Sequence, residues 1–286
     1  MTKTLRLLFP QWQGGNVPDY VLGARLLDWL APDSPDTVRA EVPVEPYDGN
    51  DLKIEDGVFG RAAVKRQLKD AAKIIAEHKP DRIVVFGGDC HVSQEPFAYL
   101  NEKYDGALGV LWLDSHPDVS TLEMHDQENA MVLGNLLGEG DPDFAKEVRK
   151  PLKPNLVMFG GLQKQLLTPR EDKIIERNRI RIAGPDRLAE SSDDILQWME
   201  ENAIRQIAVH LDLDVLSPEV FRAQLPANPD GLDFETNIGL MTFPQIARIV
   251  RDVAEKAEIV GLAIAEHMPW DAINLRNFLV KLPIFK

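Results

Sequence analysis

The stretch Leu108–Asp118, LGVLWLDSHPD, joins a continuous apolar run to a polar segment that carries three potential metal ligands. A continuous apolar run is typical of a strand that is buried on both faces, as in a parallel sheet. Side chains alternate along an extended chain, so Asp114, His116 and Asp118 should leave the strand on one side. This pattern indicates a metal site at a strand end rather than a solvated loop with chance charges.

Similar apolar runs recur along the chain and alternate with segments of helical spacing. The further strands that we predict are Leu5–Phe9, Arg82–Phe86, Asn155–Phe159, Arg179–Ala183, Gln206–Leu211 and Ile259–Ala265. The predicted helices are Tyr20–Leu30, Arg61–His78, Gln94–Lys103, Arg170–Arg177, Ser192–Asn202, Phe243–Lys256 and Ile273–Lys281. This alternation predicts an α/β fold with a parallel sheet covered on both faces. Ligands of such sheets bind beyond the carboxyl ends of the strands.

Three other predicted strands are also followed by residues that can bind metal or act in catalysis. A Gly-Gly-Asp turn after Arg82–Phe86 leads into Cys90 and His91. Asp212 and Asp214 follow the strand Gln206–Leu211, and Glu266 follows the last strand. Two carboxylates close to a core repel one another unless a cation lies between them or one takes a proton. We interpret His210, within the strand, as a core histidine with hydrogen-bond partners.

The candidate ligands are carboxylates, imidazoles and at most one thiol. Hard oxygen donors together with imidazole suit Mn²⁺ or a similar divalent ion, whereas structural zinc sites use more thiolates. Two pairs of aspartates and a histidine provide enough ligands for two ions that share carboxylates. Two such ions can hold a bridging hydroxide, which is a good nucleophile near neutral pH.

The composition restricts the partners and the location of the protein. Among its 286 residues, 46 are acidic and 32 basic, which gives a formal charge of −14. Such a field repels nucleic acid and anionic lipid and attracts cations. Cys90 is the single cysteine, so an intrachain disulfide is impossible, and we expect a reducing, cytoplasmic location. With no apolar stretch near the roughly 20 residues of a membrane span, we predict one soluble domain over residues 1–286.

The four motifs, in this order, resemble those of the ureohydrolase family, which comprises arginases, agmatinases, guanidinobutyrases and formimidoylglutamases. The resemblance extends from about Val84 to Pro269. It implies a three-layer α/β/α domain with a parallel eight-stranded sheet and two manganese ions per chain. It also implies hydrolysis of a C–N bond in a small cationic guanidino or related amidine compound, with release of urea or an equivalent. A homo-oligomer, a trimer or hexamer, is expected.

The resemblance also implies a role for each matching residue. Asp114 and Asp212 would bridge the two ions, and His116 and Asp214 would complete one of the sites. Asp118 would belong to the other site. Glu266 matches the family carboxylate that holds the guanidinium group of the substrate.

The chain departs from the family pattern at three places. Ser217-Pro218 stands where an Asp-Pro usually follows the third motif, a change that we expect to be mostly structural. Cys90 stands where the family has a histidine, and His91 follows one place later, so either residue is a candidate ligand and the Asp118 site should be the weaker. The family also has a proton-shuttling histidine in the loop that corresponds to Ser120–Val132. Here Asn129 occupies that place, and His125 is a possible substitute.

These departures leave alternatives for the function. One is a catalytically degenerate member that binds metal or ligand without turnover. Another is a metal hydrolase with a different substrate, such as an acylated amine or a phosphoester. The loops that would select the substrate, at Ser120–Asn129, Gly160–Pro169 and Phe221–Leu240, do not reveal its identity.

Overall fold

The computed structural model describes residues 2–34, 36–229 and 237–285, and its centre is an eight-stranded parallel sheet. The strands lie in the order β2-β1-β5-β10-β9-β6-β7-β8. Their bounds are β1 Thr4–Phe9, β2 Thr37–Glu41, β5 Arg82–Gly87, β6 Leu108–Leu113, β7 Val157–Gly160, β8 Arg181–Ala183, β9 Gln206–Asp212 and β10 Glu258–Ala265. A short antiparallel pair, β3 Ile54–Glu55 and β4 Val58–Phe59, lies outside this sheet.

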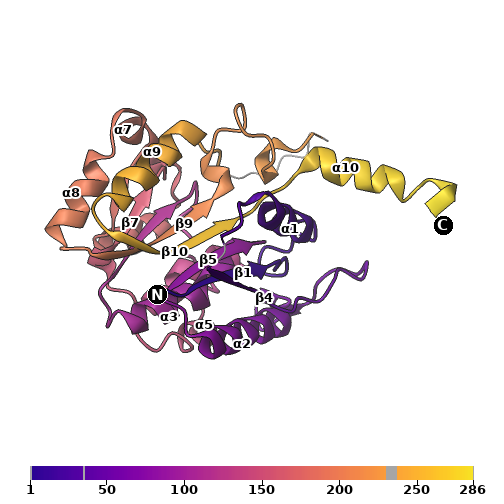
Figure 1. The fold of residues 1–286 in the computed structure, drawn as a ribbon, viewed down its shortest axis with the longest axis horizontal. Helices are drawn as coiled ribbons and strands as arrows, with labels where there is room; N and C mark the ends of the chain where they lie inside the picture. The colour runs from indigo at the N-terminus through magenta and orange to yellow at the C-terminus, as the bar shows by residue number, and fades with distance from the viewer. Residues whose placement is uncertain (1, 35, 230–236, 286) are drawn as a thin grey trace.

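Helices connect the strands and cover the sheet. They are α1 Tyr20–Leu30, α2 Arg61–His78, α3 Gln94–Lys103, α4 Val132–Leu137, α5 Pro142–Ala145, α6 Pro169–Asn178, α7 Pro185–Glu190, α8 Asp193–Glu201, α9 Phe243–Ala254 and α10 Trp270–Leu279. Figure 1 shows α2 and α3 on one side of the sheet and α8 and α9 on the other. The predicted three-layer α/β/α arrangement is therefore confirmed.

Side chains of the central strands alternate between two hydrophobic cores. Val110 and Trp112 of β6 belong to the core under α2 and α3, and Leu111 and Leu113 belong to the core under α8 and α9. Because both faces of the strand are buried, a continuous apolar run was needed at Leu108–Leu113.

The seven predicted strands and seven predicted helices are all present, with ends that differ by a few residues. The prediction missed β2, the eighth strand, which lies at the edge of the sheet beside β1. Its sequence, TVRAE, is half-buried or exposed and has no continuous apolar run. An edge strand can be polar because one side of it faces solvent, so the apolar pattern did not reveal it.

The sheet order brings the four strands with polar ends together. These strands, β5, β10, β9 and β6, are consecutive neighbours at the centre of the sheet, although they are far apart in the sequence. All are parallel, so their carboxyl ends meet at one edge. Their polar residues are therefore brought to one place by topology.

The last helix leaves the body of the domain, as Figure 1 shows for α10. Its Ile273 is buried, whereas Leu275, Phe278 and Leu279 are exposed. Across the described residues, no helix combines the length and apolarity needed to cross a membrane.

Gly88, directly after β5, should tolerate no side chain. Its N–H donates to Phe9 O at 3.0 Å, and a Cβ there would overlap the backbone carbonyl of Gln11. We expect Gly88→Ala to lower the free energy of unfolding by about 1–3 kcal/mol or more, because backbone cannot yield as a flexible side chain can. Thermal or denaturant unfolding measures this change.

Gly184→Ala is the matched control, since the nearest atom to its added Cβ would be 3.9 Å away. That variant should change stability by no more than about 1 kcal/mol, the size of an N-cap effect. Equal stability of the two variants would contradict the steric account of Gly88.

Candidate metal centre

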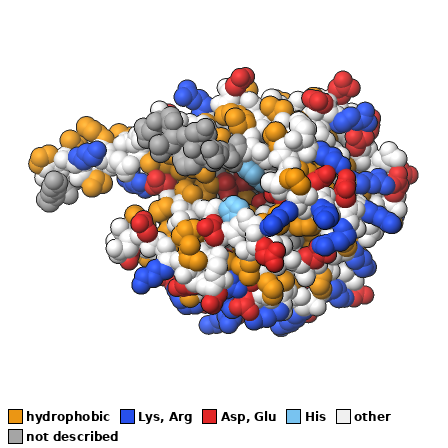
Figure 2. Space-filling model, turned by 180° about the vertical axis from the view of Figure 1, so that it is seen from behind, with side chains coloured by type: hydrophobic (Ala, Val, Ile, Leu, Met, Phe, Trp, Pro, Cys, Tyr) orange, Lys and Arg blue, Asp and Glu red, His pale blue; other side chains and the backbone are white. Residues whose placement is uncertain are grey.

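The four strand ends deliver their polar side chains to one pocket of about 560 Å³. The five carboxylates of the cluster, Asp114, Asp118, Asp212, Asp214 and Glu266, are all buried. Figure 2 shows this face hollowed, with acidic and histidine side chains gathered in the hollow. The predicted convergence of the aspartates and His116 at the carboxyl edge of the sheet is what the structure shows.

The aspartates reach the pocket through tight turns rather than through extended strands. Asp114 Oδ1 accepts from the N–H of His116 at 2.7 Å, and Asp212 Oδ1 accepts from the N–H of Asp214 at 2.7 Å. In both cases a carboxylate closes a turn two residues ahead, which is a common role for aspartate. Asp118 has left-handed backbone, with φ of 49°. Strand alternation therefore predicted the right residues, but turns position them.

Donor atoms of Asp114, His116 and Asp214 form one group, all within 4.8 Å of one another. His116 Nδ1 lies 2.9 Å from Asp214 Oδ2 and 3.5 Å from Asp114 Oδ1. These are oxygen and nitrogen donors, which suit Mn²⁺.

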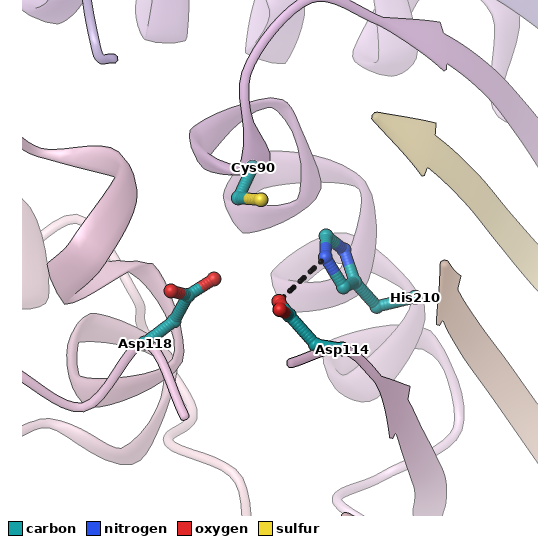
Figure 3. Close-up of side chains that lie close together, drawn as sticks. All are labelled: Cys90, Asp114, Asp118 and His210. Atoms are coloured by element: carbon teal, nitrogen blue, oxygen red, sulfur yellow. Dashed lines mark ion pairs between the residues drawn. The ribbon is translucent and has the colours of Figure 1, made fainter. Parts of the chain in front are cut away.

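Cys90 belongs to two further groups with the same spacing. One contains Cys90, Asp114, Asp118 and His210 (Figure 3), and the other contains Cys90, Asp212 and Glu266. The Cys90 thiol donates to Asp212 Oδ2 at 2.8 Å. Asp114 and Cys90 therefore link the three groups into one continuous cluster.

His91 is not part of this cluster, which corrects its inclusion among the candidate ligands. Its Nδ1 lies 3.1 Å from Gln11 Oε1, and its ring packs edge-on against Phe144. The physical reason is local: Cys90–Ser93 forms a 3₁₀ turn capped by Asp89, and consecutive side chains of such a turn point in different directions. Of the two alternatives that the sequence left open, Cys90 faces the pocket.

His210 lies closer to the cluster than the sequence interpretation suggested. It is a buried core histidine, as expected, with Nδ1 2.8 Å from Ser93 Oγ. However, its Nε2 lies 3.6 Å from Asp114 Oδ2, on the cluster side. A signal was available: His210 and Asp212 are two apart in β9, so their side chains share a face of the sheet.

Comparison with known proteins agrees with this geometry. A family model described as the arginase family matches residues 29–274, most of the chain. The chain belongs to the arginase family. The mitochondrial arginase of Medicago truncatula is 24% identical over 80% of this chain and 59% of its own length. The arginase of Schizosaccharomyces pombe is 26% identical over 72% of this chain and 62% of its own length. The chain thus spans about three fifths of these relatives.

Solved structures of arginase-family proteins share the fold. The Entamoeba histolytica arginase in complex with L-ornithine superposes with a TM-score of 0.77 at 16% identity, over 94% of this chain and 92% of that one. The formimidoylglutamase of Bacillus subtilis gives a TM-score of 0.66 at 13% identity, over 94% and 80%. At these identities the likeness establishes the fold, and both the family and the fold class predicted from the sequence are confirmed.

The electrostatics of this arginase-family cluster call for a cation. Burial and neighbouring carboxylates raise the pKa of Asp118 and Asp212 well above the usual range, and burial with Asp214 raises the pKa of Glu266 to about 7. Asp118 Oδ2 is buried and has no hydrogen-bond partner among the described residues. A divalent ion would supply the missing positive charge and the missing contact, so the donor set fits a metal.

Opposite shifts mark the Asp114 end of the cluster. Burial alone would raise the pKa of Asp114, but contacts with His116 and His210 lower it. Likewise, burial alone would lower the pKa of His116, whereas Asp214 and Asp114 raise it well above the usual value. Asp114 is therefore readily ionised, as suits an anionic ligand.

The three candidate catalytic residues lie at different depths. Glu266 is buried, with Oε2 accepting from the Tyr20 hydroxyl at 2.6 Å and Oε1 accepting from Asn129 Nδ2 at 3.0 Å. Its φ of 63° and its N–H bond to Gly88 O fix this position. His125 lines the same pocket but is exposed. Asn129 thus contacts Glu266 directly, and His125 lies at a solvent-accessible part of the pocket.

Metal removal should make stability depend on pH in a defined direction. Without metal, Asp118, Asp212 and Glu266 keep protons in the folded state that the unfolded chain releases above its pKa of about 4. Folding then binds protons, so stability falls as pH rises through the raised pKa values. His91 and His210 have lowered pKa values, so their contribution to stability rises with pH, but only below the unfolded-state histidine pKa of about 6.5.

We therefore expect the Tm of chelator-treated protein to fall between about pH 6.5 and pH 8, the range just above the histidine pKa. Saturating Mn²⁺ should remove most of this dependence and raise the Tm. Scanning fluorimetry with and without EDTA measures both effects. A chelated protein whose Tm is flat or rises over this range would contradict the electrostatic account.

Proposed function

We propose that this chain is a manganese-dependent hydrolase of a C–N bond in a guanidino or related amidine compound, which releases urea or an equivalent. The observation that carries the proposal is the cluster of five buried carboxylates, the buried His210 and the half-buried His116 at the carboxyl edge of an arginase-family sheet. Residues 1–286 would act as one catalytic domain. A cytoplasmic location stays a prediction, supported by the single cysteine.

The proposed ligands follow the three groups of donor atoms. Asp114, His116 and Asp214 would hold one ion, and Asp118 with Cys90 and Asp114 would hold the second. Asp212, which accepts from the Cys90 thiol, would contribute a further carboxylate. When bound, the two ions supply Lewis-acid activation of water and stabilise developing negative charge.

The residues of the chain bind and orient the substrate. Glu266 offers a carboxylate that a guanidinium cation would favour in its ionised form, because a nearby positive charge lowers a raised carboxyl pKa. Tyr20 and Asn129 hold this carboxylate from two sides and so restrict the orientation of the cation. The net charge of −14 adds attraction for cationic substrates.

A proton must reach the leaving amine, and His125 is the candidate donor. Partial desolvation in the pocket lowers its pKa, so the imidazole is mostly neutral at neutral pH and must first take a proton from the solvent to which it is exposed. Asn129 cannot serve, because an amide does not titrate. We assign Asn129 to positioning Glu266 instead.

The substrate within the amidine class is set by the loops around the pocket. Proteins with this fold include an arginase, a formimidoylglutamase and a proclavaminate amidino hydrolase, so the fold accommodates different amidine compounds. Of the three candidate loops, Phe221–Leu240 includes residues 230–236, which lie outside the described residues.

A metal-binding protein without turnover is the second candidate function. The observation that favours it is the pair of departures at Cys90 and Asn129. Each of these residues stands where the family pattern has a histidine, so both positions lack an imidazole. Metal binding with no urea release from any amidine tested would support it.

Urea release across a panel of guanidino and formimidoyl compounds, with Mn²⁺ present, tests the proposal. Ammonia or formamide release covers the non-guanidino members. We expect turnover of at least one cationic compound, and we expect Glu266→Gln to lower kcat/KM by about 30-fold or more. Losing one partner of a buried charge pair costs about 2–5 kcal/mol.

Glu123→Gln is the matched control, because Glu123 is an exposed acid of the loop beside the pocket. That variant should keep the activity of the parent. Full activity of Glu266→Gln would refute the assignment of Glu266, and absence of turnover with all compounds would favour the second candidate function.

The exposed apolar side chains of α10 support a homo-oligomer, a trimer or hexamer, as the family resemblance implies. Light scattering at micromolar concentration should give the mass of three or six chains. Leu275→Asp with Phe278→Asp should shift the protein toward the monomer, whereas Ile54→Asp, at another exposed apolar position, should not. A monomeric parent protein would refute this prediction.

A further inference from the structure

Cys90 and His210 approach Asp114 and Asp118 from different elements of the fold. Cys90 follows β5, His210 is within β9, and the two aspartates follow β6. One donor atom from each of the four residues lies within 4.8 Å of the others. Figure 3 shows these side chains arranged around a common space.

His210 is held as a metal-ligating histidine is held. Its ring stacks on Trp112 with centroids 3.7 Å apart and an interplanar angle of 10°, and it is fully buried. Ser93 Oγ lies 2.8 Å from Nδ1 and can accept a hydrogen bond from the Nδ1–H group. In this tautomer Nε2 carries a lone pair. Ligating histidines are oriented in this way by a partner on the other ring nitrogen.

The Nε2 atom of His210 has no hydrogen-bond partner within the described part of the chain. It forms an ion pair with Asp114 Oδ2 at 3.6 Å, which is longer than a normal hydrogen bond (Figure 3). A buried ring nitrogen without a partner is costly, and what sets His210 apart from His91, whose Nε2 is also unpaired, is that its Nε2 belongs to a group of four donor atoms. The unpaired atom faces the same space as Cys90 Sγ and a second unpaired atom, Asp118 Oδ2.

We propose that His210 supplies the nitrogen donor of the Asp118 site, and that Cys90, His210, Asp114 and Asp118 together form a site selective for Zn²⁺ over Mn²⁺. The inference rests on the metal centre of the proposed function but not on its substrate. Cys90, which replaces the family histidine, would thus bind the ion together with His210 from β9.

The chemistry of the donors gives the selectivity. A thiolate is a soft ligand that suits Zn²⁺ better than Mn²⁺, and four donors complete the tetrahedral shell that Zn²⁺ prefers. Zinc bonds of about 2.0–2.3 Å place ligand atoms about 3–4 Å apart, so a small contraction of the group would close the site. The group of Asp114, His116 and Asp214 has no sulfur donor and suits Mn²⁺. The centre would therefore hold two different ions.

Cobalt titration of metal-free protein tests the ligands directly, because Co²⁺ occupies zinc sites and absorbs in the near ultraviolet when a thiolate binds it. We expect this absorption in the parent protein and its loss in Cys90→Ser. His210→Gln should keep the thiolate absorption but weaken it and alter the visible bands. Calorimetry should show the Zn²⁺ dissociation constant rising by about tenfold or more in both variants, the usual effect of a ligand change.

His91→Gln is the matched control, because His91 is the adjacent buried histidine and points away from the cluster. Its Zn²⁺ affinity and cobalt spectrum should equal those of the parent. A loss in His91→Gln with none in His210→Gln would overturn the proposal, as would a cobalt complex without thiolate absorption.

Anomalous scattering at the zinc and manganese edges, from parent protein crystallised with both metals, decides the matter if His210→Gln does not fold. Zinc bonded to Cys90 Sγ and His210 Nε2 is the expected result, and zinc elsewhere or manganese in this position overturns it. Zinc in place without amidine turnover would refute the proposed function alone. Turnover with manganese in both sites would refute this inference alone.

Discussion

The constraint on which the rest of the site depends is the repulsion among five buried carboxylates at one edge of the sheet. Burial of these groups, together with their mutual repulsion, makes this placement unfavourable without a cation and raises the pKa of Asp118, Asp212 and Glu266. A divalent ion would convert the repulsion into attraction. The geometry of the strand ends would then be most stable with metal bound, and folding and metal binding would be coupled through the same residues.

Topology makes this concentration of charge possible. The parallel strands β5, β10, β9 and β6 are neighbours, so every one of their carboxyl ends opens into the same pocket. The turns after β6 and β9 then use one carboxylate oxygen to close the backbone. The apolar strands beneath anchor these turns in two well-packed cores, which limits how far the ligands can move apart.

The surroundings of Cys90 show how a change at one ligand position is connected to its neighbours. Its thiol contacts Asp212 and lies in the group that contains His210, while the neighbouring His91 packs against Phe144. The replacement of the family histidine by Cys90 is therefore best understood together with Asp212 and His210, which face it across the pocket. Asn129 illustrates the same point, since it contacts Glu266 from a loop far away in the sequence.

The sequence by itself determined the α/β class, seven of the eight strands of the sheet, and the carboxylates of the cluster, because these are recorded in local patterns of apolar runs and the polar residues that follow them. It did not reveal β2, whose edge position needs no apolar run, or the choice between Cys90 and His91. Those two residues are adjacent, so only the 3₁₀ turn decides which of them faces the pocket. The approach of His210 to Asp118 was also decided by tertiary structure, although its spacing of two from Asp212 indicated that both side chains share a face of β9. The pairing order of strands is set by packing between distant segments, and no local pattern encodes which strand ends will meet.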